Sequence, residues 1–176
     1  MKKLPFIFGA LAVASLTLVS CNDDDNNNVN SGVSGTYNLK EVNTETQTDF
    51  DQDGTAHTNQ MQESQCYNNG KITLNADGTL TYVVTGILIS TADGSVGCKQ
   101  EYQATGQWQQ QSGNDENAVI SAVYTDQNGD NNIVTLTKTG TTLTYVNDNL
   151  LSTYPNRNSN GEPVYTSGAT TYVFKK

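Results

Sequence analysis

Three aspartates alternate with other residues over a short stretch of the chain, in the spacing of a calcium-binding loop. Asp49, Asp51 and Asp53 stand at the first, third and fifth positions, where such loops carry carboxylate ligands. Gly54 at the sixth position permits the sharp turn around the ion, and Thr55 at the seventh position can offer its backbone carbonyl. The candidate calcium ligands are therefore Asp49, Asp51, Asp53 and Thr55.

The second half of this loop departs from the calcium pattern. An EF-hand has a bidentate Glu at its twelfth position, whereas this chain has Gln60 there, and Glu63 comes too late for the standard register. Any bound calcium would therefore be held weakly, near the millimolar affinities of extracellular modules. A solvated Asp-Gly turn without an ion stays open as the alternative, although the like charges repel one another and so favour a counterion.

Other groupings that carry chemistry are missing from the sequence. His57 is the only histidine and no serine stands in a Gly-x-Ser-x-Gly pattern, so a catalytic triad cannot be assembled. A carboxylate pair for glycoside hydrolysis stays open among Glu101, Asp115 and Glu116. The 9 basic residues face 18 acidic ones, with a net charge of −9, which leaves no cationic surface for nucleic acid. We expect no enzymatic activity and no nucleic-acid partner.

The N-terminal residues follow the order of a bacterial lipoprotein signal. Lys2 and Lys3 precede the apolar stretch Leu4–Val19, which is shorter than the roughly 20 residues of a membrane-spanning helix. The tetrad Leu18-Val19-Ser20-Cys21 then resembles the lipobox, in which a peptidase cleaves before a lipid-modified cysteine. We therefore expect a signal peptide at residues 1–20 and attachment to the membrane through a lipid anchor on Cys21.

The residues after the lipobox favour a flexible tether over positions 21–34. Asp23-Asp24-Asp25 and the asparagines that follow cannot bury enough apolar surface to offset the entropy lost on ordering. The acidic triplet also resembles the export signal by which some Gram-negative bacteria send lipoproteins to the outer leaflet. We predict an outer-membrane, lipid-anchored protein displayed on the cell surface, with a merely solvated spacer as the alternative.

Two further cysteines are predicted to form a disulfide. The three cysteines would leave an odd thiol in an exported protein, but lipidation of Cys21 leaves Cys66 and Cys98 as a pair. An exported chain reaches an oxidising compartment, which favours the bond. Zinc is not expected at these two residues, since a structural zinc site needs four ligands.

From residue 35 to the end, the sequence alternates with the period of a β-strand. Runs such as Thr79-Leu80-Thr81-Tyr82 put threonine on one face and large apolar side chains on the other, as half-buried antiparallel strands do. Turn formers separate about eight such runs, and Asn128-Gly129 between Ala118–Thr125 and Ile133–Thr139 is the clearest hairpin. The sequence predicts an all-β domain over residues 35–176, either a sandwich or an up-and-down barrel.

Three segments carry less regular patterns. Thr79–Ser90 reads as the longest strand, losing its alternation from Ile87 to Ile89, and a further strand is expected over Cys98–Thr105. Asn59–Gln65 is the one weak helical segment. Residues 148–168 read as a long loop without regular structure, a kind of loop that is often functional.

The order of the motifs along the chain is informative. The lipobox and acidic tether are followed by Gly35-Thr36-Tyr37, the aspartate-rich loop, Cys66, Asp77-Gly78-Thr79, Cys98, Gly106-Gln107-Trp108 and the ending Tyr172-Val173-Phe174-Lys175. This order resembles that of the small lipocalin-like domain lipoproteins of Gram-negative bacteria. That family begins its barrel with Gly-x-Trp, where this chain has Tyr37. The resemblance implies an antiparallel up-and-down barrel of about eight strands that holds a small apolar ligand.

Aromatic side chains on the inward strand faces are the candidate ligand-binding residues. They combine an apolar body with a polar tip, which suits either a core or an amphipathic ligand. The candidates are Tyr82, Trp108, Tyr124, Tyr145 and Tyr172.

Two functions of different classes follow. The first is a lipid-anchored envelope protein that carries a small hydrophobic or amphipathic ligand in a barrel cavity. The second is a surface interaction or structural lipoprotein with a filled core, which contacts a glycan or a partner protein through residues 148–168. The volume of the interior distinguishes them, because a carrier needs a cavity of several hundred Å³. In both cases we expect a monomer.

Overall fold

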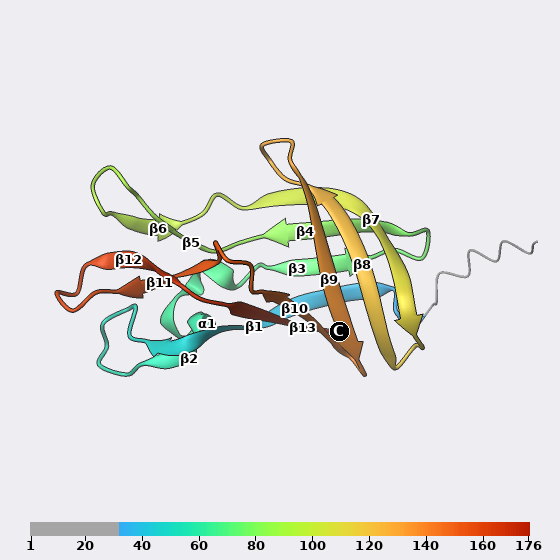
Figure 1. Cartoon of the computed structure of the whole chain (residues 1–176), viewed down its shortest axis with the longest axis horizontal. Coiled ribbons are helices and arrows are strands. Elements are labelled where there is room, and N and C mark those ends of the chain that lie inside the picture. Colours follow the sequence, from blue (N-terminus) through green and yellow to red (C-terminus); the bar gives the residue numbers. More distant parts are fainter. Residues whose placement is uncertain (1–31) are drawn as a thin grey trace, which may run out of the picture.

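A computed structural model of the chain describes residues 32–176 (Figure 1). The expected signal peptide, lipidation at Cys21 and most of the tether concern residues outside this range. The described elements are β1 (Gly35–Thr48), β2 (His57–Asn59), α1 (Gln60–Glu63), the 3-10 helix η1 (Gln65–Tyr67), β3 (Lys71–Leu74), β4 (Thr79–Val84), β5 (Ile87–Ile89), β6 (Val96–Cys98), β7 (Tyr102–Gly113), β8 (Asn117–Thr125), β9 (Asn131–Thr139), β10 (Thr142–Asn147), β11 (Thr153–Arg157), β12 (Pro163–Ser167) and β13 (Thr170–Lys175).

Eight of these strands form a closed antiparallel barrel. β1, β3, β4, β7, β8, β9, β10 and β13 pair in this order, each with the next, and β13 pairs back with β1. The short strand β2 joins the outer edge of β1 beyond the barrel. The prediction of an all-β, antiparallel up-and-down barrel with one short helical segment is therefore confirmed.

The alternation of polar and apolar residues decides which face of each strand turns inward. In β8, Ala118, Ile120 and Ala122 are buried, whereas Val119 and Val123 at the alternate positions face solvent. The inward side chains of the other strands join them in one continuous core. Burying such side chains stabilises the fold by roughly 1.5–3 kcal/mol for each large aliphatic or aromatic residue.

The outward face carries a row of threonines in direct cross-strand register. Thr36, Thr73, Thr81, Thr105 and Thr125 lie on five successive barrel strands and pair one with the next. The hydroxyl oxygens of Thr36 and Thr73 lie 3.1 Å apart, within hydrogen-bonding distance. Such cross-strand threonine pairs contribute a few tenths of a kcal/mol each to the sheet. The solvent-facing threonines predicted from the sequence thus also form contacts between neighbouring strands.

One end of the barrel is closed by aromatic side chains near the start of β1. Tyr37 is fully buried and its hydroxyl donates to the carbonyl of Val33 at 2.5 Å, while Trp108 donates its indole N–H to the carbonyl of Asn75 at 2.9 Å. The two sites share this end because Gly35 pairs with Leu74. Val33 is itself fully buried, so the folded domain begins before residue 35, where the sequence placed its start.

Two strand predictions were wrong in their extent. The expected strand Thr79–Ser90 is divided at Gly86, whose φ of 157° suits glycine, and the chain there leaves the barrel to form β5. Ile87 and Ile89 are buried in this second strand and Leu88 is exposed, which explains the apparent loss of alternation. The expected strand Cys98–Thr105 is divided likewise, since β6 ends at Cys98.

Residues 148–168 were predicted to lack regular structure, and this was also wrong. They contain the hairpin β11–β12, in which Pro155 pairs with Tyr165 and Arg157 with Pro163. Each of these strands pairs only with the other and keeps a free edge, where a proline without an N–H is tolerated. Pro155 and Pro163 are therefore edge-strand residues.

The hairpins β5–β6 and β11–β12 extend from the end of the barrel opposite to the start of β1 (Figure 1). β5–β6 is tied down by the predicted disulfide, which is confirmed: Cys66 in η1 is bonded to Cys98 at the end of β6. Across residues 32–176, no helix is both long and apolar enough to span a membrane.

Removing the disulfide should destabilise the protein without changing its topology. The two cysteines are 32 residues apart, and releasing a loop of that length costs about 3–4 kcal/mol through the entropy of the unfolded chain. Chemical denaturation should therefore show that loss for the double variant Cys66→Ser/Cys98→Ser, and an equal loss for the reduced wild type. A double variant as stable as the oxidised protein would contradict this account.

Candidate functional site

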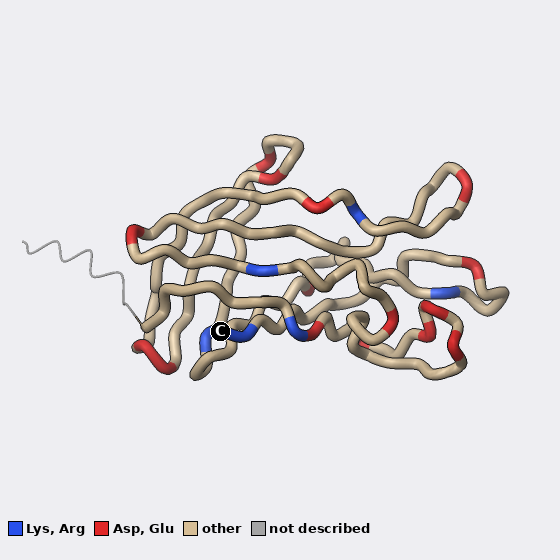
Figure 2. Tube along the Cα trace, turned by 180° about the vertical axis from the view of Figure 1, so that it is seen from behind, with Lys and Arg blue, Asp and Glu red and all other residues tan. Residues whose placement is uncertain are grey.

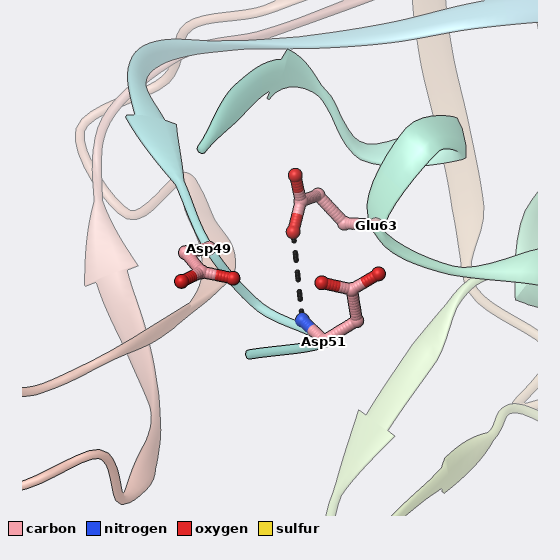
Figure 3. A group of neighbouring side chains, drawn as sticks. All are labelled: Asp49, Asp51 and Glu63. Atoms are coloured by element: carbon pink, nitrogen blue, oxygen red, sulfur yellow. Dashed lines mark hydrogen bonds between the residues drawn. The ribbon is translucent and has the colours of Figure 1, made fainter. Parts of the chain in front are cut away.

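The acidic loop between β1 and β2 brings carboxylates from two segments together. Asp49 and Asp51 follow β1, and Glu63 reaches them from α1; one oxygen from each residue lies within 4.8 Å of the others (Figure 3). This is the only such grouping of acidic, histidine or cysteine side chains within residues 32–176. The loop proposed from the sequence is thus the site in the described chain that best fits a metal ion.

Backbone amides of the loop turn toward its aspartates. Asp49 accepts from the N–H of Gly54 at 3.2 Å, Asp51 from that of Asp53 at 3.2 Å, and Asp53 from that of Thr55 at 2.7 Å. Gly54 has a φ of 89°, the left-handed conformation for which glycine is suited. The backbone of this segment therefore turns around its own carboxylates, as expected for aspartates at positions 1, 3 and 5 of the loop followed by glycine at position 6.

Glu63 is the buried acid on which the loop closes. Its side chain is fully buried and accepts from the N–H of Phe50 at 2.7 Å, from the N–H of His57 at 3.1 Å and from Nδ1 of His57 at 2.6 Å. The short helix α1 places it there, with Asn59 as its N-cap accepting from the N–H of Met61. A buried carboxylate needs such partners, because its desolvation is costly.

Arg157 ties the neighbouring hairpin β11–β12 to the acidic loop. Its Nε donates to the carbonyl of Phe50 at 2.9 Å, and its guanidinium lies 5.0 Å from the centre of the Phe50 ring. Its Nη1 donates to the carbonyl of Gly161 at 2.9 Å. Arg157 therefore binds carbonyls and an aromatic ring, and within residues 32–176 no Lys or Arg forms an ion pair with the loop carboxylates.

One carboxylate oxygen in this site has no partner. Oδ1 of Asp49 is buried and accepts no hydrogen bond, which is costly for a charged group. Calcium binds carboxylate oxygens at 2.3–2.6 Å, so two ligands on opposite sides of one ion lie about 5 Å apart, close to the span of this cluster. The donor set of Asp49, Asp51 and Glu63 therefore fits a calcium ion.

The structure gathers only part of the predicted ligand set. Asp49 and Asp51 lie in the cluster, whereas Asp53 and Thr55 stand in the adjoining exposed turn. Glu63 was set aside on sequence grounds because it falls beyond the EF-hand register. The chain folds back through β2 and α1, and this brings Glu63 next to the loop. The sequence feature that could have indicated this is the helical turn α1, which Asn59 caps and in which Glu63 lies.

Calcium should bind this loop with low affinity, and Asp49 should be needed for it. Titration calorimetry with millimolar calcium is expected to give saturable heat for the wild type and at least a tenfold weaker response for Asp49→Asn, because the buried oxygen is the least satisfied ligand.

Asp93→Asn is the matched control. Asp93 lies in an exposed turn of β5–β6, where hydrogen bonds from Ser90 and Ser95 lower its pKa to about 2. Its replacement should leave calcium binding unchanged. Absence of heat in the wild type would reduce the loop to a solvated turn.

The predicted aromatic residues separate into two groups. Tyr82 and Tyr124 make an edge-to-face contact with ring centroids 5.5 Å apart, and Tyr145 stacks on Tyr172 at 5.7 Å. These four tyrosines form a cluster inside the barrel; three of them line its cavity with Ile72, Leu80, Ala122, Val134 and Leu136. Trp108, at the closed end, is not among the residues that line it.

The interior beside these tyrosines is nearly filled. The cavity measures about 10 Å³, enough for about one water molecule, whereas pockets for small ligands span roughly 300–1,000 Å³. Burial raises the pKa of the Tyr172 phenol from 10.0 to about 12, and burial likewise holds the pKa of Tyr82 well above its usual value. These hydroxyls therefore stay neutral at physiological pH.

The carboxylates considered for glycoside hydrolysis do not meet. Glu101 stands just before β7, whereas Asp115 and Glu116 stand just after it, at the other end of a 12-residue strand. His57 is engaged by Glu63 rather than by a serine or cysteine. Comparison with protein-family models, with curated proteins and with solved structures finds no match to this chain.

The tyrosine cluster should make the barrel sensitive to alkali. Because the folded pKa of Tyr172 is raised, its contribution to stability is complete below pH 10 and is lost as the pH rises toward about 12. Denaturation midpoints should fall over this window, and less so in Tyr172→Phe. Tyrosinate absorbance should titrate later in the folded protein than in the chemically unfolded chain; identical curves would contradict the burial argument.

Proposed function

We propose that this protein is a lipid-anchored component of the cell envelope that contacts a glycan or a partner protein through the hairpin end of a filled barrel. The observation that carries the proposal is the small volume, about 10 Å³, of the cavity beside the tyrosine cluster. That volume favours the filled-core hypothesis over ligand transport, because a carrier cavity must enclose most of its ligand.

The hairpin end has the properties of a preformed contact surface. Tyr165 of β12 accepts a hydrogen bond on its hydroxyl oxygen from the backbone N–H of Ile89 in β5 at 3.1 Å, and so joins the two hairpins. Thr46 of β1 and Tyr154 of β11 are hydrogen-bonded through their hydroxyls at 2.7 Å. Contacts of this kind hold the segments in place before a partner arrives, which lowers the ordering cost of binding.

Exposed apolar side chains on this end support an interaction role. Leu88 of β5 and Val96 of β6 are 48% and 43% exposed, and Leu150 and Leu151 in the turn before β11 are almost fully exposed. The Leu150-Leu151 turn is held by Asn149, whose side chain accepts from the N–H of Leu151. A partner that covers these residues would gain apolar contact area.

The proposed anchor is compatible with this use of the hairpin end. The described chain begins beside the closed end of the barrel, opposite to the hairpins (Figure 1). A lipid on Cys21 and a short tether would attach the closed end to the membrane. The hairpin end would then be directed outward, and outer-membrane surface display as expected from the acidic triplet would make it accessible.

Anchoring and ligand content can be measured on protein purified from its own host. Native mass spectrometry should find the chain from Cys21 onward with its lipid modification and no co-purifying small molecule. Cys21→Ser should abolish the modification and move the protein out of the membrane fraction. A stoichiometric hydrophobic ligand would instead support the carrier hypothesis, and an unmodified chain would refute the anchor.

The contact surface is tested separately. Glycan arrays and protein cross-linking on intact cells should give a signal that is lost in the double variant Leu150→Ser/Leu151→Ser. Ile133→Ser is the matched control, because Ile133 is an exposed apolar residue of the barrel wall and not of the hairpin end. An equal signal in all three proteins would reject this surface.

A further inference from the structure

The barrel strand β9 has a free backbone edge along its first half. β9 pairs with β8 over its whole length, residues 131–139. Its pairing with β10 is shorter and stops at Leu136, which lies opposite Tyr145. In Figure 1, β9 accordingly runs at a steep angle to β10. Residues 131–135 of β9 therefore have a neighbouring strand on one side only, and we call them the free edge.

The hydrogen bonds of the β8–β9 hairpin show which backbone groups point to the free edge. At the turn of this hairpin, the N–H of Asp126 donates to the carbonyl of Asp130 at 2.9 Å. Bonds of an antiparallel ladder alternate along each strand, so the even-numbered residues of β9 bond to β8 and the odd-numbered ones point away from it. Asn131 and Ile133 therefore direct their N–H and C=O groups to the free edge. Within residues 32–176, no group is hydrogen-bonded to the backbone of Ile133 on that side.

The free edges of the two hairpins are less suited to pairing with another strand. Those of β11 and β12 carry Pro155 and Pro163, which have no N–H to donate. That of β5 is already bonded, because the hydroxyl of Tyr165 accepts from the N–H of Ile89. The free edge of β9 has neither a proline nor a lysine to protect it, and Ile133 at its centre favours an extended strand.

An extended peptide backbone is the chemical group that completes such an edge. An added strand presents its own N–H and C=O groups at alternate residues, and each pairs with a free group of the edge strand. Solvent reaches this part of β9, since Ile133 is 76% exposed and Asn131 and Thr135 are exposed as well. A peptide would therefore lie beside β9 in the position from which β10 diverges.

Acidic residues stand on both sides of the free edge. Asp126 and Asp130 form the turn that precedes it, and this turn projects from the barrel in Figure 2 with its acidic residues in red. Asp148 follows the end of β10. Burial, and after it the charge of Asp148, raises the pKa of Tyr145, the last β10 residue that pairs with β9. No ion pair within residues 32–176 involves these three aspartates, so the edge favours a partner of positive charge.

We propose that the free edge of β9 binds an extended, positively charged peptide segment of a partner protein as an added strand. The peptide backbone pairs with Asn131 and Ile133, and its lysine or arginine side chains reach the flanking aspartates. A second copy of this chain is the less suitable occupant, because the same three aspartates flank its edge and would repel those of the first. The proposal goes beyond the contact function of the hairpin end and does not depend on it.

Fluorescence anisotropy of a dye-labelled peptide tests the proposal on the full chain, in detergent where the chain carries lipid. The probe is a short capped peptide of alternating valine and threonine with two lysines at each end. It should bind the wild type saturably, and added salt should weaken binding because salt screens opposite charges. The same peptide with an N-methyl group on each valine and threonine keeps its charge but loses its backbone donors. It should bind at least tenfold more weakly.

Ile133→Pro removes the N–H that faces the free edge, a group that the ladder to β8 does not use. It should weaken binding of the peptide at least tenfold, whereas Ile133→Ser keeps this N–H and should stay within about threefold of the wild type. Val96→Pro is the matched control, because the N–H of Val96 faces away from β5 on another edge. It should bind the peptide like the wild type. Unfolding midpoints close to that of the parent show that the variants are folded.

The charge requirement is tested by the double variant Asp130→Asn/Asp148→Asn. It should bind the peptide several-fold more weakly than the wild type and with less dependence on salt. A wild type that binds no peptide, or that binds the N-methylated peptide equally well, would overturn the proposal even if Ile133→Pro fails to fold. Dimerisation of the wild type that Ile133→Pro abolishes would assign the edge to a second copy and overturn it as well.

Discussion

The pairing of β1 with β13 is the constraint on which the rest of the structure depends. It joins the first and last strands of the described chain, from Asn38 opposite Lys175 to Thr44 opposite Thr170, and so converts a row of strands into a closed wall. Closure covers most of the edges of eight strands and turns one face of each toward a common interior. It also leaves the second half of β1 free to extend past the barrel and to carry β2, α1 and the acidic loop.

The interior of the barrel is packed with side chains and leaves only a small cavity. An eight-stranded barrel is just wide enough to be filled by side chains or to hold one small ligand. Here the four tyrosines share the interior with the aliphatic side chains of Ile72, Leu80 and Leu136, and Tyr82 lies directly opposite Ile72 in the sheet. The buried side chain of Lys138 and the aromatic residues of the closed end also help to fill this interior. The contact function that we propose accordingly uses the outer surface of the barrel.

Much of the fold could be predicted from residue patterns because those patterns report local physics. Alternating Thr and Leu specified the strands, Asn128-Gly129 marked the turn between β8 and β9, and the count of cysteines indicated the Cys66–Cys98 bond. The three successive apolar residues Ile87–Ile89 could equally signal a strand covered on both faces or a change of sheet. Only the non-local pairing of β5 with β6 decides between these.

The candidate calcium site was also predictable only where it depends on a local pattern of residues. Asp49 and Asp51 belong to a short-range pattern, whereas Glu63 enters through a turn of the chain that linear spacing does not encode. The alternation of polar and apolar residues likewise predicts that Tyr82, Tyr124, Tyr145 and Tyr172 point into the barrel. It does not specify where along the barrel axis each side chain lies. Trp108 shares their inward phase and yet lies at the closed end.

Closure by β1 and β13 also determines when the barrel can form. The partner of the first described strand is Thr170–Lys175, so that pairing must wait until the chain has been made through β13. Contacts of such long sequence separation fold slowly, because the loop entropy is lost before the contacts form. Until then β1 exposes unpaired backbone groups along the edge that β13 later covers. The newly made chain therefore spends its most aggregation-prone interval with the edge of β1 uncovered.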